Sequence, residues 1–431
     1  MGKNIYDLII IGGGIVGLSL LKELEKKEVG NYLLLEKEKI GFGSSSSSSK
    51  LLHIGYRYLE YFDFKSFIEA FVETKYWYRN FPELVKPVLH EMPVFKNWGH
   101  KPTWLGQLVV ALLQPFLTWF IEGKPRFFRR KKSNFSDFPG YKGSIFFWDY
   151  VMEDGEICEK IKSQRVHNKC QRDKNEIKEN SEVINLEKTG ESWNVILKNG
   201  EEYLAKKVVL AIGPWLVENE YVKNMAKKLL RISSGTQIYV DKVWLENAVF
   251  LHDRKRERLV YVVPEKGKRL EVMGQEQEEK SKFKEQIANV KLKCQEKLPF
   301  RDLGSCKDKN EANCTRVGIT VRDSDKVDLS ESNDEIEELL SYLKEFFPEQ
   351  NIGYENIIKA IRGYRPHAFK KRAEEKKDFL DRTVRSDEIQ PGLFVLVGGK
   401  FAIARCMARE FVRKKWKIGF EVAKLGIPKS L

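Results

Sequence analysis

The first 36 residues predict a β-strand, a glycine-rich turn, a helix and a second strand in immediate succession. Residues 7–11 form a short, mostly apolar run that is typical of a buried parallel strand. Residues 12–17 then contain the pattern G-x-G-x-x-G, and a second apolar run at 32–35 ends in Glu36, about 20 residues after the glycines. This order predicts a Rossmann-like α/β unit that binds a dinucleotide.

Each glycine of this turn has its own physical role. Gly12 lets the chain turn tightly, Gly14 lets backbone amides approach a pyrophosphate, and Gly17 lets helix and strand pack closely. The N-terminus of the following helix offers free N–H groups and a partial positive charge to the phosphates. Glu36 can accept hydrogen bonds from ribose hydroxyls, and its charge disfavours a ribose 2′-phosphate. These residues alone do not distinguish FAD from NAD.

A second motif follows at residues 43–60, where six serines precede Lys-Leu-Leu-His-Ile-Gly-Tyr-Arg-Tyr-Leu-Glu. Serines alone would predict a flexible low-complexity loop. With this continuation, the segment resembles the signature G-T-S-S-R-S-S-K-L-I-H-G-G-x-R-Y-L-E of the flavin-dependent glycerol-3-phosphate dehydrogenases. Further blocks resemble the same family in the same order, at residues 101–105, 208–215, 362–366 and 397–405.

The resemblance implies an α/β fold with a Rossmann-like FAD-binding domain and an interleaved α+β substrate domain that contains an antiparallel sheet. For the FAD-binding domain we expect residues 1–90, 145–235 and 385–431. For the substrate or cap domain we expect residues 91–144 and 236–384, with a charged, partly helical surface insertion at 265–313.

The same resemblance implies the site residues. For the substrate, it implies that Arg57 and Arg365 hold a phosphate and that Lys400 lies near the reacting oxygen; His53 is a candidate proton acceptor because this chain lacks the family's own one. Arginine suits a phosphate dianion because its planar guanidinium bonds two oxygens at once. We expect no metal ligands. The residues expected along FAD are Gly12, Gly14, Gly17, Glu36, Lys37, Ser45, Ser46, Lys50, Gly213, Gly399, Lys400 and Phe401.

The substrate end departs from the family pattern. The family's Lys-Gly-Ser-His stretch, which contains its candidate proton acceptor, corresponds here to a stretch ending in Gln237, and an amide cannot take up a proton at neutral pH. Val321 replaces an acid, and Ala402 and Ile403 replace threonines. Three interpretations therefore stay open: oxidation of glycerol 3-phosphate with His53 or water as the base, a related FAD enzyme for another hydroxy acid or amine, or a flavin-bound protein without dehydrogenase activity.

Charge favours an anionic substrate. The formal net charge is +14, which attracts anionic partners. The sequence contains no zinc-finger spacing and no nucleic-acid-binding motif, so we expect no nucleic acid among them. The resemblance implies that the electrons pass to quinone or another acceptor.

Residues 104–121 form the longest apolar segment. Gln107, Gln114 and Pro115 argue against a membrane span. The tryptophans at both ends and the basic residues at 126–132 favour an interfacial position, and a buried helix is the alternative. Because no secretory signal is visible, we expect a cytoplasmic protein that lies peripherally on the cytoplasmic membrane face.

One further helix is predicted late in the chain. Residues 332–335, Ser-Asn-Asp-Glu, match a capping box, and apolar residues then recur at helical spacing until Pro348. This stripe predicts core packing.

Overall fold

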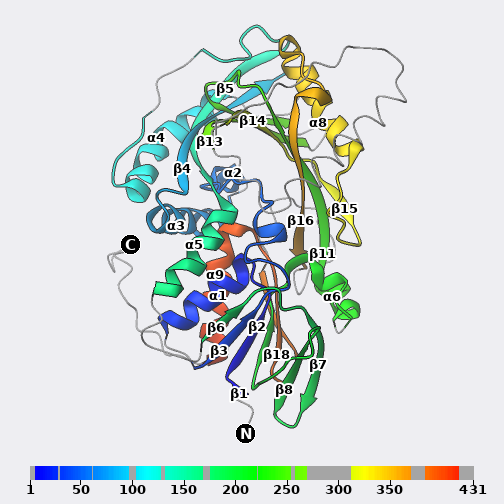
Figure 1. Ribbon diagram of the computed structural model, residues 1–431. Helices are drawn as coiled ribbons and strands as arrows, with labels where there is room; N and C mark the ends of the chain where they lie inside the picture. Colours follow the sequence, from blue (N-terminus) through cyan, green and yellow to red (C-terminus); the bar gives the residue numbers. More distant parts are fainter. Residues whose placement is uncertain are drawn as a thin grey trace, which may run out of the picture.

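The structure is a computed structural model that describes residues 5–27, 30–60, 62–96, 103–127, 132–167, 175–220, 222–253, 258–268, 312–369 and 384–416. Two halves lie one above the other (Figure 1). The lower half contains the glycine-rich turn and both small sheets, and the upper half is built on one large sheet.

The lower half is organised around a six-stranded sheet. Neighbouring strands are parallel, except for the antiparallel edge strand β17. In spatial order the strands are β17 (Val384–Gln390), β18 (Leu393–Gly398), β10 (Val208–Leu210), β2 (Leu8–Ile11), β3 (Tyr32–Leu35) and β6 (Glu176–Lys178). A second sheet in this half has the order β1 (Ile5–Tyr6), β9 (Glu202–Ala205), β8 (Ser192–Leu197) and β7 (Val183–Thr189).

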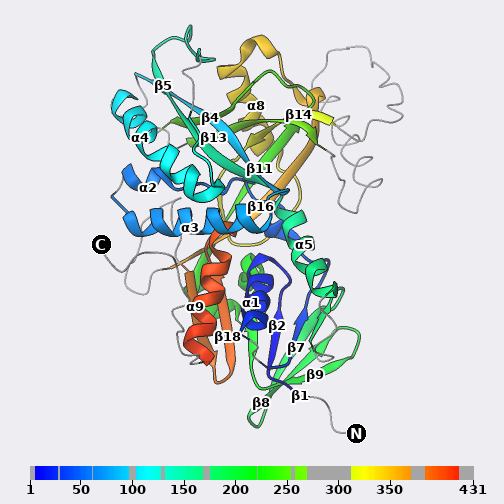
Figure 2. The same cartoon turned by 90° about the vertical axis from the view of Figure 1, so that its left-hand side faces the viewer.

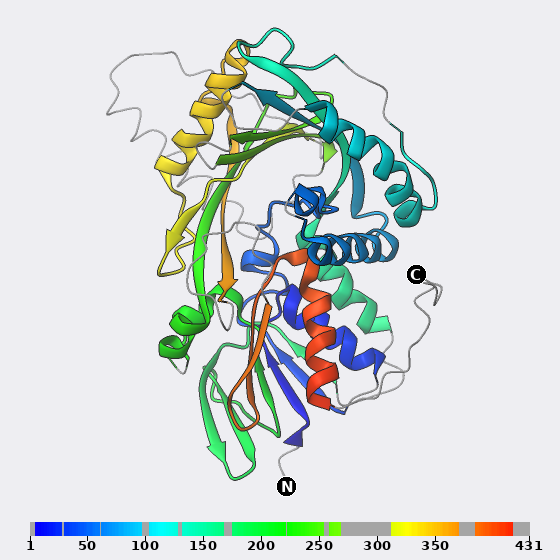
Figure 3. The ribbon, with the colours of Figure 1, turned by 180° about the vertical axis from the view of Figure 1, so that it is seen from behind.

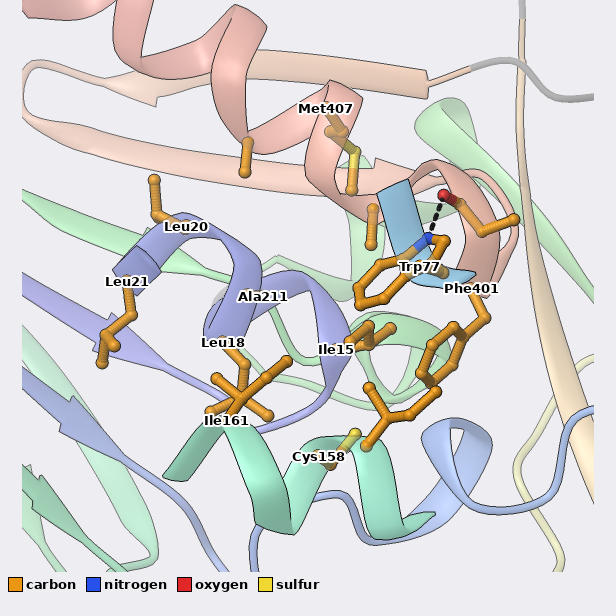
Figure 4. Packing of buried hydrophobic residues seen from close by; sticks show 14 of the residues in the cluster. Ile15, Leu18, Leu20, Leu21, Trp77, Cys158, Ile161, Ala211, Phe401 and Met407 are labelled. Atoms are coloured by element: carbon orange, nitrogen blue, oxygen red, sulfur yellow. Dashed lines mark hydrogen bonds between the residues drawn. The ribbon is translucent and has the colours of Figure 1, made fainter. Parts of the chain in front are cut away.

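Both faces of the six-stranded sheet are buried, which explains the continuous apolar runs in its strands. On one face, Ile10 packs in a cluster with α1 (Ile15–Lys26), α5 (Asp154–His167) and α9 (Ala404–Trp416). Figure 4 shows side chains of all three helices meeting in this cluster. On the other face, Ile9 packs against residues of the four-stranded sheet.

The upper half is an eight-stranded, mainly antiparallel sheet. Its strands are β15 (Arg322–Ser324), β11 (Leu230–Val240), β14 (Ala312–Gly318), β13 (Arg258–Lys268), β12 (Ala248–Asp253), β4 (Val85–Phe95) and β5 (Tyr141–Met152), with β16 (Ile357–Ala368) paired to β11. The helix α8 (Asn333–Phe346) covers the outer face of this sheet (Figure 3).

Three helices lie at the side of the molecule between the halves (Figure 2). They are α2 (Tyr56–Glu60), α3 (Phe64–Asn80) and α4 (Thr103–Glu122), and α4 packs against β5. The remaining helical segments are short: η1 (Gly43–Ser45), η3 (Gly213–Val217), α6 (Lys223–Leu229), η4 (Pro348–Gln350), η5 (Tyr354–Asn356) and η6 (Phe401–Ile403).

The predicted fold class is confirmed. The predicted domain boundaries near positions 90, 145 and 235 fall inside β4, β5 and β11, which all belong to the large sheet. We therefore propose that the domains divide at the ends of these strands. Glu265 lies buried in β13, so we propose that the charged insertion predicted at about 265–313 begins after this strand; residues 269–311 lie outside the described part of the chain.

The predicted helix near the end of the substrate segment is confirmed as α8, but its capping box is wrong. Ser332 is the N-cap residue, yet its side chain makes no capping hydrogen bond. Glu335 instead accepts hydrogen bonds from the hydroxyls of Ser234, at 3.2 Å, and Thr236. The Glu335 carboxylate is buried against the sheet, where an unpaired charge would be costly, so it takes these donors. At the exposed helix end, water can replace the missing capping hydrogen bond.

Candidate cofactor and substrate site

A cavity of about 1510 Å³ extends from the glycine-rich turn to the inner face of the large sheet. Gly12, Gly14 and Glu36 line one end of it. Tyr261 and Arg365 line the other end. The cavity therefore joins the predicted cofactor residues to the predicted substrate residues.

The turn before α1 can only be built from glycine at two positions. Gly12 has a φ of +109°, and a Cβ there would lie 2.6 Å from the Ala211 carbonyl oxygen. A Cβ on Gly17 would lie 2.0 Å from the Gly12 carbonyl oxygen. The turn consequently brings the N-terminus of α1 against the cavity. There the Ser45 hydroxyl accepts a hydrogen bond from the Ile15 N–H at 2.9 Å.

Glu36 lies at the carboxyl end of β3 and is held by the neighbouring backbone. Its carboxylate accepts hydrogen bonds from the N–H groups of Gly13, at 2.6 Å, and Glu38, at 2.9 Å. Burial raises the pKa of Glu36 above its ordinary value. Lys37 also lines the cavity, and its ammonium lies 3.0 Å from a carboxylate oxygen of Glu182.

Arg365 is the prominent cation at the substrate end. It lies on β16 opposite Ser233 of β11 and lines the cavity. Its Nη2 is buried and has no hydrogen-bond partner among the described residues. Burial lowers the pKa of Arg365, because the charged form loses hydration. A guanidinium that lines a cavity and has an unpaired N–H group can donate hydrogen bonds to an anion.

His53 forms a pair with Asp149, a residue that the sequence did not single out. The Nδ1 of His53 lies 3.2 Å from a carboxylate oxygen of Asp149, which also accepts hydrogen bonds from the N–H groups of Ile54 and Tyr150. Burial opposes the charged carboxylate, but the hydrogen bond from His53 and these other contacts lower the pKa of Asp149. Because an ionised carboxylate only accepts hydrogen bonds, Nδ1 carries a proton, and in the neutral imidazole Nε2 is then the acceptor.

The chain matches the family described as FAD dependent oxidoreductase over residues 7–411. The chain belongs to this family. The prediction of FAD as the cofactor is thereby confirmed. The glycine turn, the N-terminus of α1 and Glu36 fit the adenosine diphosphate half of FAD, since they present a close backbone approach, amide donors and an acceptor along one cavity.

The resemblance to glycerol-3-phosphate dehydrogenases is confirmed by a curated relative. The aerobic glycerol-3-phosphate dehydrogenase of Staphylococcus haemolyticus is 26% identical over 431 aligned residues, which cover 94% of this chain. The chain spans only 66% of the length of that relative.

Solved structures show the same fold. The glycerol-3-phosphate dehydrogenase from Bacillus halodurans, complexed with FAD, has a TM-score of 0.61 at 18% identity, covering 97% of this chain and 66% of that one. The glycine oxidase from Geobacillus kaustophilus has a TM-score of 0.60 at 15% identity, covering 96% of each chain. At these identities the likeness shows the fold alone.

Two of the residues predicted along FAD point elsewhere. Ser46 and Lys50 are not among the residues that line the cavity. The Lys50 ammonium lies 3.1 Å from a carboxylate oxygen of Glu153 and 3.8 Å from one of Asp154. Burial opposes its charge, but Tyr239 and these two acids raise the pKa of Lys50. Lys50 thus holds the serine segment, residues 43–49, through contacts outside the cavity.

Gln237 also supports the serine segment. Its side-chain amide donates a hydrogen bond to the Ser48 carbonyl oxygen at 3.0 Å, and it does not line the cavity. Arg316, which the sequence analysis missed, donates to the next carbonyl oxygen, that of Ser49, at 2.5 Å. At the position of the family's candidate base, this chain therefore has a residue that holds the segment next to the cofactor site.

The last family-like block, at residues 397–405, lines part of the cavity. Gly398 and Gly399 have φ values of +91° and +79° at the end of β18, and Lys400 and Phe401 line the cavity immediately after this turn. The Trp77 indole N–H donates to the Ala402 carbonyl oxygen at 2.8 Å (Figure 4). Arg405 and Glu73 form a buried bidentate ion pair with N–O distances of 3.0 and 2.6 Å. The block is therefore fixed against α3.

The remaining predicted site residues are Gly213 and Arg57. Gly213 lines the cavity, with a φ of +59°. The side chain of Arg57 lies outside the described residues. The described residues contain no group of three or more His, Cys, Asp or Glu side chains that could hold a metal ion. Asp149 is 96 residues from His53 and belongs to no motif, so only its place on β5 reveals it.

Proposed function

We propose that this chain catalyses the FAD-dependent oxidation of an anionic secondary alcohol, with sn-glycerol 3-phosphate as the first candidate substrate and dihydroxyacetone phosphate as the product. The observation that carries the proposal is Arg365, which lines the same cavity as His53 and whose Nη2 is buried without a hydrogen-bond partner among the described residues. The name of the Staphylococcus haemolyticus relative supports this choice of substrate.

His53 is proposed as the proton acceptor. Asp149 orients the imidazole through Nδ1, which leaves the Nε2 lone pair free to take the hydroxyl proton. FAD, when bound, supplies the acceptor for the hydride from the alcohol carbon. Arg365 would hold the anionic group, and Lys400 would stabilise the negative charge that develops on the reacting oxygen. A role for Arg57 in binding the anion stays a prediction.

Anaerobic mixing of the FAD-loaded protein with sn-glycerol 3-phosphate tests this function. We expect the flavin absorbance to bleach, and glycerol, which lacks the anionic group, to have little effect. His53→Asn is the informative variant, because His53 has a φ of +56° and asparagine tolerates this conformation. Loss of the proton acceptor should slow bleaching about 100-fold. If no alcohol or amine bleaches the flavin, the chain is a flavin-binding protein without dehydrogenase activity.

We also propose that α4 rests on an anionic lipid surface. The inward face of α4 contains polar side chains that contact the sheet beside buried apolar ones such as Leu117 and Ile121. The side-chain carbonyls of Gln107 and Gln114 accept hydrogen bonds from the N–H groups of Phe146 and Trp148 on β5, at 2.8 and 2.7 Å. The Glu122 carboxylate accepts from the Tyr150 hydroxyl at 2.6 Å.

Apolar side chains occupy the outward face of α4. Leu112 is 70% exposed and Trp119 is 52% exposed, and Leu108 and Phe116 lie on the same face. Among the described residues, no helix is both long and apolar enough to cross a membrane. A lipid interface fits this face better than a protein partner, because the sequence that follows is strongly basic at 129–132. The same interface would give access to quinone as the electron acceptor.

Co-sedimentation with vesicles tests the proposed lipid contact. We expect binding to anionic vesicles that salt weakens without abolishing, because salt screens the charges but not apolar insertion. The double variant Leu112→Ser, Phe116→Ser should lose most of the salt-resistant binding. Met225→Ser is the control, since Met225 is an exposed apolar residue on α6. Failure to bind anionic vesicles at low salt, or formation of a dimer that buries α4, would refute the proposal.

A further inference from the structure

We infer that the substrate chamber accepts an anionic amphiphile: a secondary alcohol that carries one anionic group and a long apolar group. This inference rests on the proposed function, because it names the substrate class of the same site. The observation behind it is the chemistry of the chamber wall, which is much more apolar than glycerol 3-phosphate requires.

The wall is the inner face of the large sheet. Adjacent strands β13, β12, β4 and β5 each contribute large apolar side chains to one cluster, and these side chains line the cavity. We call this set the apolar wall: Met92, Ile145, Phe147, Phe250, Leu259 and Ile319. Phe250 forms edge-to-face contacts with Phe147, at a centroid distance of 6.4 Å, so the wall is a packed surface.

The charged groups and the proposed proton acceptor lie on other segments than this wall, whose strands also bring His90, His252 and Tyr261 to the cavity. Arg365 supplies a cation from β16, Lys400 follows the turn after β18, and His53 lines the same cavity. Behind His53, the carboxylate of Asp149 is already occupied by three donors. The chamber thus provides a cation for one anionic group and a proton acceptor for one reacting hydroxyl.

Glycerol 3-phosphate carries a second hydroxyl, which on this side of the chamber would meet a wall made mainly of apolar side chains. A hydroxyl placed against Phe250 or Ile319 would lose its hydrogen bonds to water and gain none. An alkyl chain in the same place would instead remove its own surface and that of the wall from water. Val321, at the position where the family has an acid, lines the same cavity and removes a further polar contact.

The entrance of the cavity has the same character. Leu59, Phe62 and Val109 line the cavity, and Phe62 is 75% exposed. Val109 belongs to α4, whose outward face is the apolar surface proposed to contact lipid. One helix therefore borders both the cavity and the surface from which an amphiphile would arrive.

Binding of n-alkyl phosphates to the FAD-loaded protein tests the inference. These ligands have the anionic group and the chain but no secondary hydroxyl, so binding is measured without turnover. Calorimetry with ethyl to octyl phosphate, below their micelle concentrations and without vesicles, should show affinity rising by up to about fourfold for each added methylene. Leu259→Asn should reduce this gain per methylene. Leu112→Asn, on the outward face of α4, should not.

An affinity that does not change with chain length would overturn the inference. So would an unchanged gain in Leu259→Asn together with a loss of the gain in Leu112→Asn, because the chain would then bind to α4. Catalysis separates the two proposals. Bleaching by glycerol 3-phosphate with no improvement for its 1-octyl ether would refute the amphiphile and keep the dehydrogenase. Bleaching by neither, nor by any other alcohol or amine, would refute the proposed function itself.

Discussion

Replacing Gly14 with valine is expected to empty the FAD site while the protein remains folded. A Cβ at this position would point at the Ser45 hydroxyl, 2.9 Å away, and no backbone atom outside the local chain is approached as closely. Valine would therefore fill the space above the N-terminus of α1, where the pyrophosphate is expected, without breaking the turn. Loss of two charge-assisted hydrogen bonds, at about 1.5–3 kcal/mol each, corresponds to an affinity at least about 100-fold lower.

The measurement is the ratio of flavin to protein after purification and reconstitution, together with the melting temperature of the apoprotein. Ser46→Ala is the matched control, because the Ser46 hydroxyl donates to the Gly43 carbonyl oxygen at 3.2 Å and does not line the cavity. This variant should retain FAD. Full flavin occupancy in Gly14→Val would contradict the assignment of the turn to the pyrophosphate.

Replacing Arg365 with methionine should abolish recognition of the anionic substrate. Arg365 lines the cavity, and its Nη2 is buried without a partner among the described residues, so a bound anion would gain one or two charge-assisted hydrogen bonds that water screens little. With two such bonds, kcat/KM for flavin reduction should fall by roughly 100-fold to 10,000-fold. Stability should change little, because methionine removes an unfavourable buried charge and fills a similar volume.

Rapid-mixing measurements under anaerobic conditions give kcat/KM from the dependence of bleaching on substrate concentration, and thermal unfolding reports stability. Arg231→Met is the control, since Arg231 lies on the neighbouring strand β11, is partly exposed and does not line the cavity. An Arg365→Met variant with unchanged kcat/KM would show that another group binds the anion. A large loss of stability would show that Arg365 is structural.

The sequence alone determined the features that depend on neighbouring residues. The strand, glycine turn, helix and acid between Tyr6 and Glu36 could be predicted because their spacing and residue types specify one local geometry. The block at 397–405 was identified by its resemblance to a known family, and the structure adds the positive φ values at Gly398 and Gly399, which favour glycine. The FAD cofactor and the fold class were likewise implied by the resemblance of the ordered motifs to that family.

Contacts between distant segments were decided only by the tertiary structure. Gln237 donates a hydrogen bond to Ser48, which is 189 residues away in the sequence, and no residue pattern predicts that contact. Lys50 belongs to a motif that implied FAD, yet its ammonium is drawn away from the cavity by Glu153 and Asp154, because a buried charge must find opposite charges.

In helix α4, the sequence determined the composition and the tertiary structure decided the orientation. Its apolar composition was evident from the sequence, but the direction of each face was not. The edge strand β5 has free N–H groups that need acceptors, and Gln107 and Gln114 supply them. Satisfying the edge strand turns the polar residues inward and leaves Leu112 and Phe116 facing outward. Hydropathy records how apolar a helix is, whereas the hydrogen-bonding needs of its neighbour determine which side the apolar residues occupy.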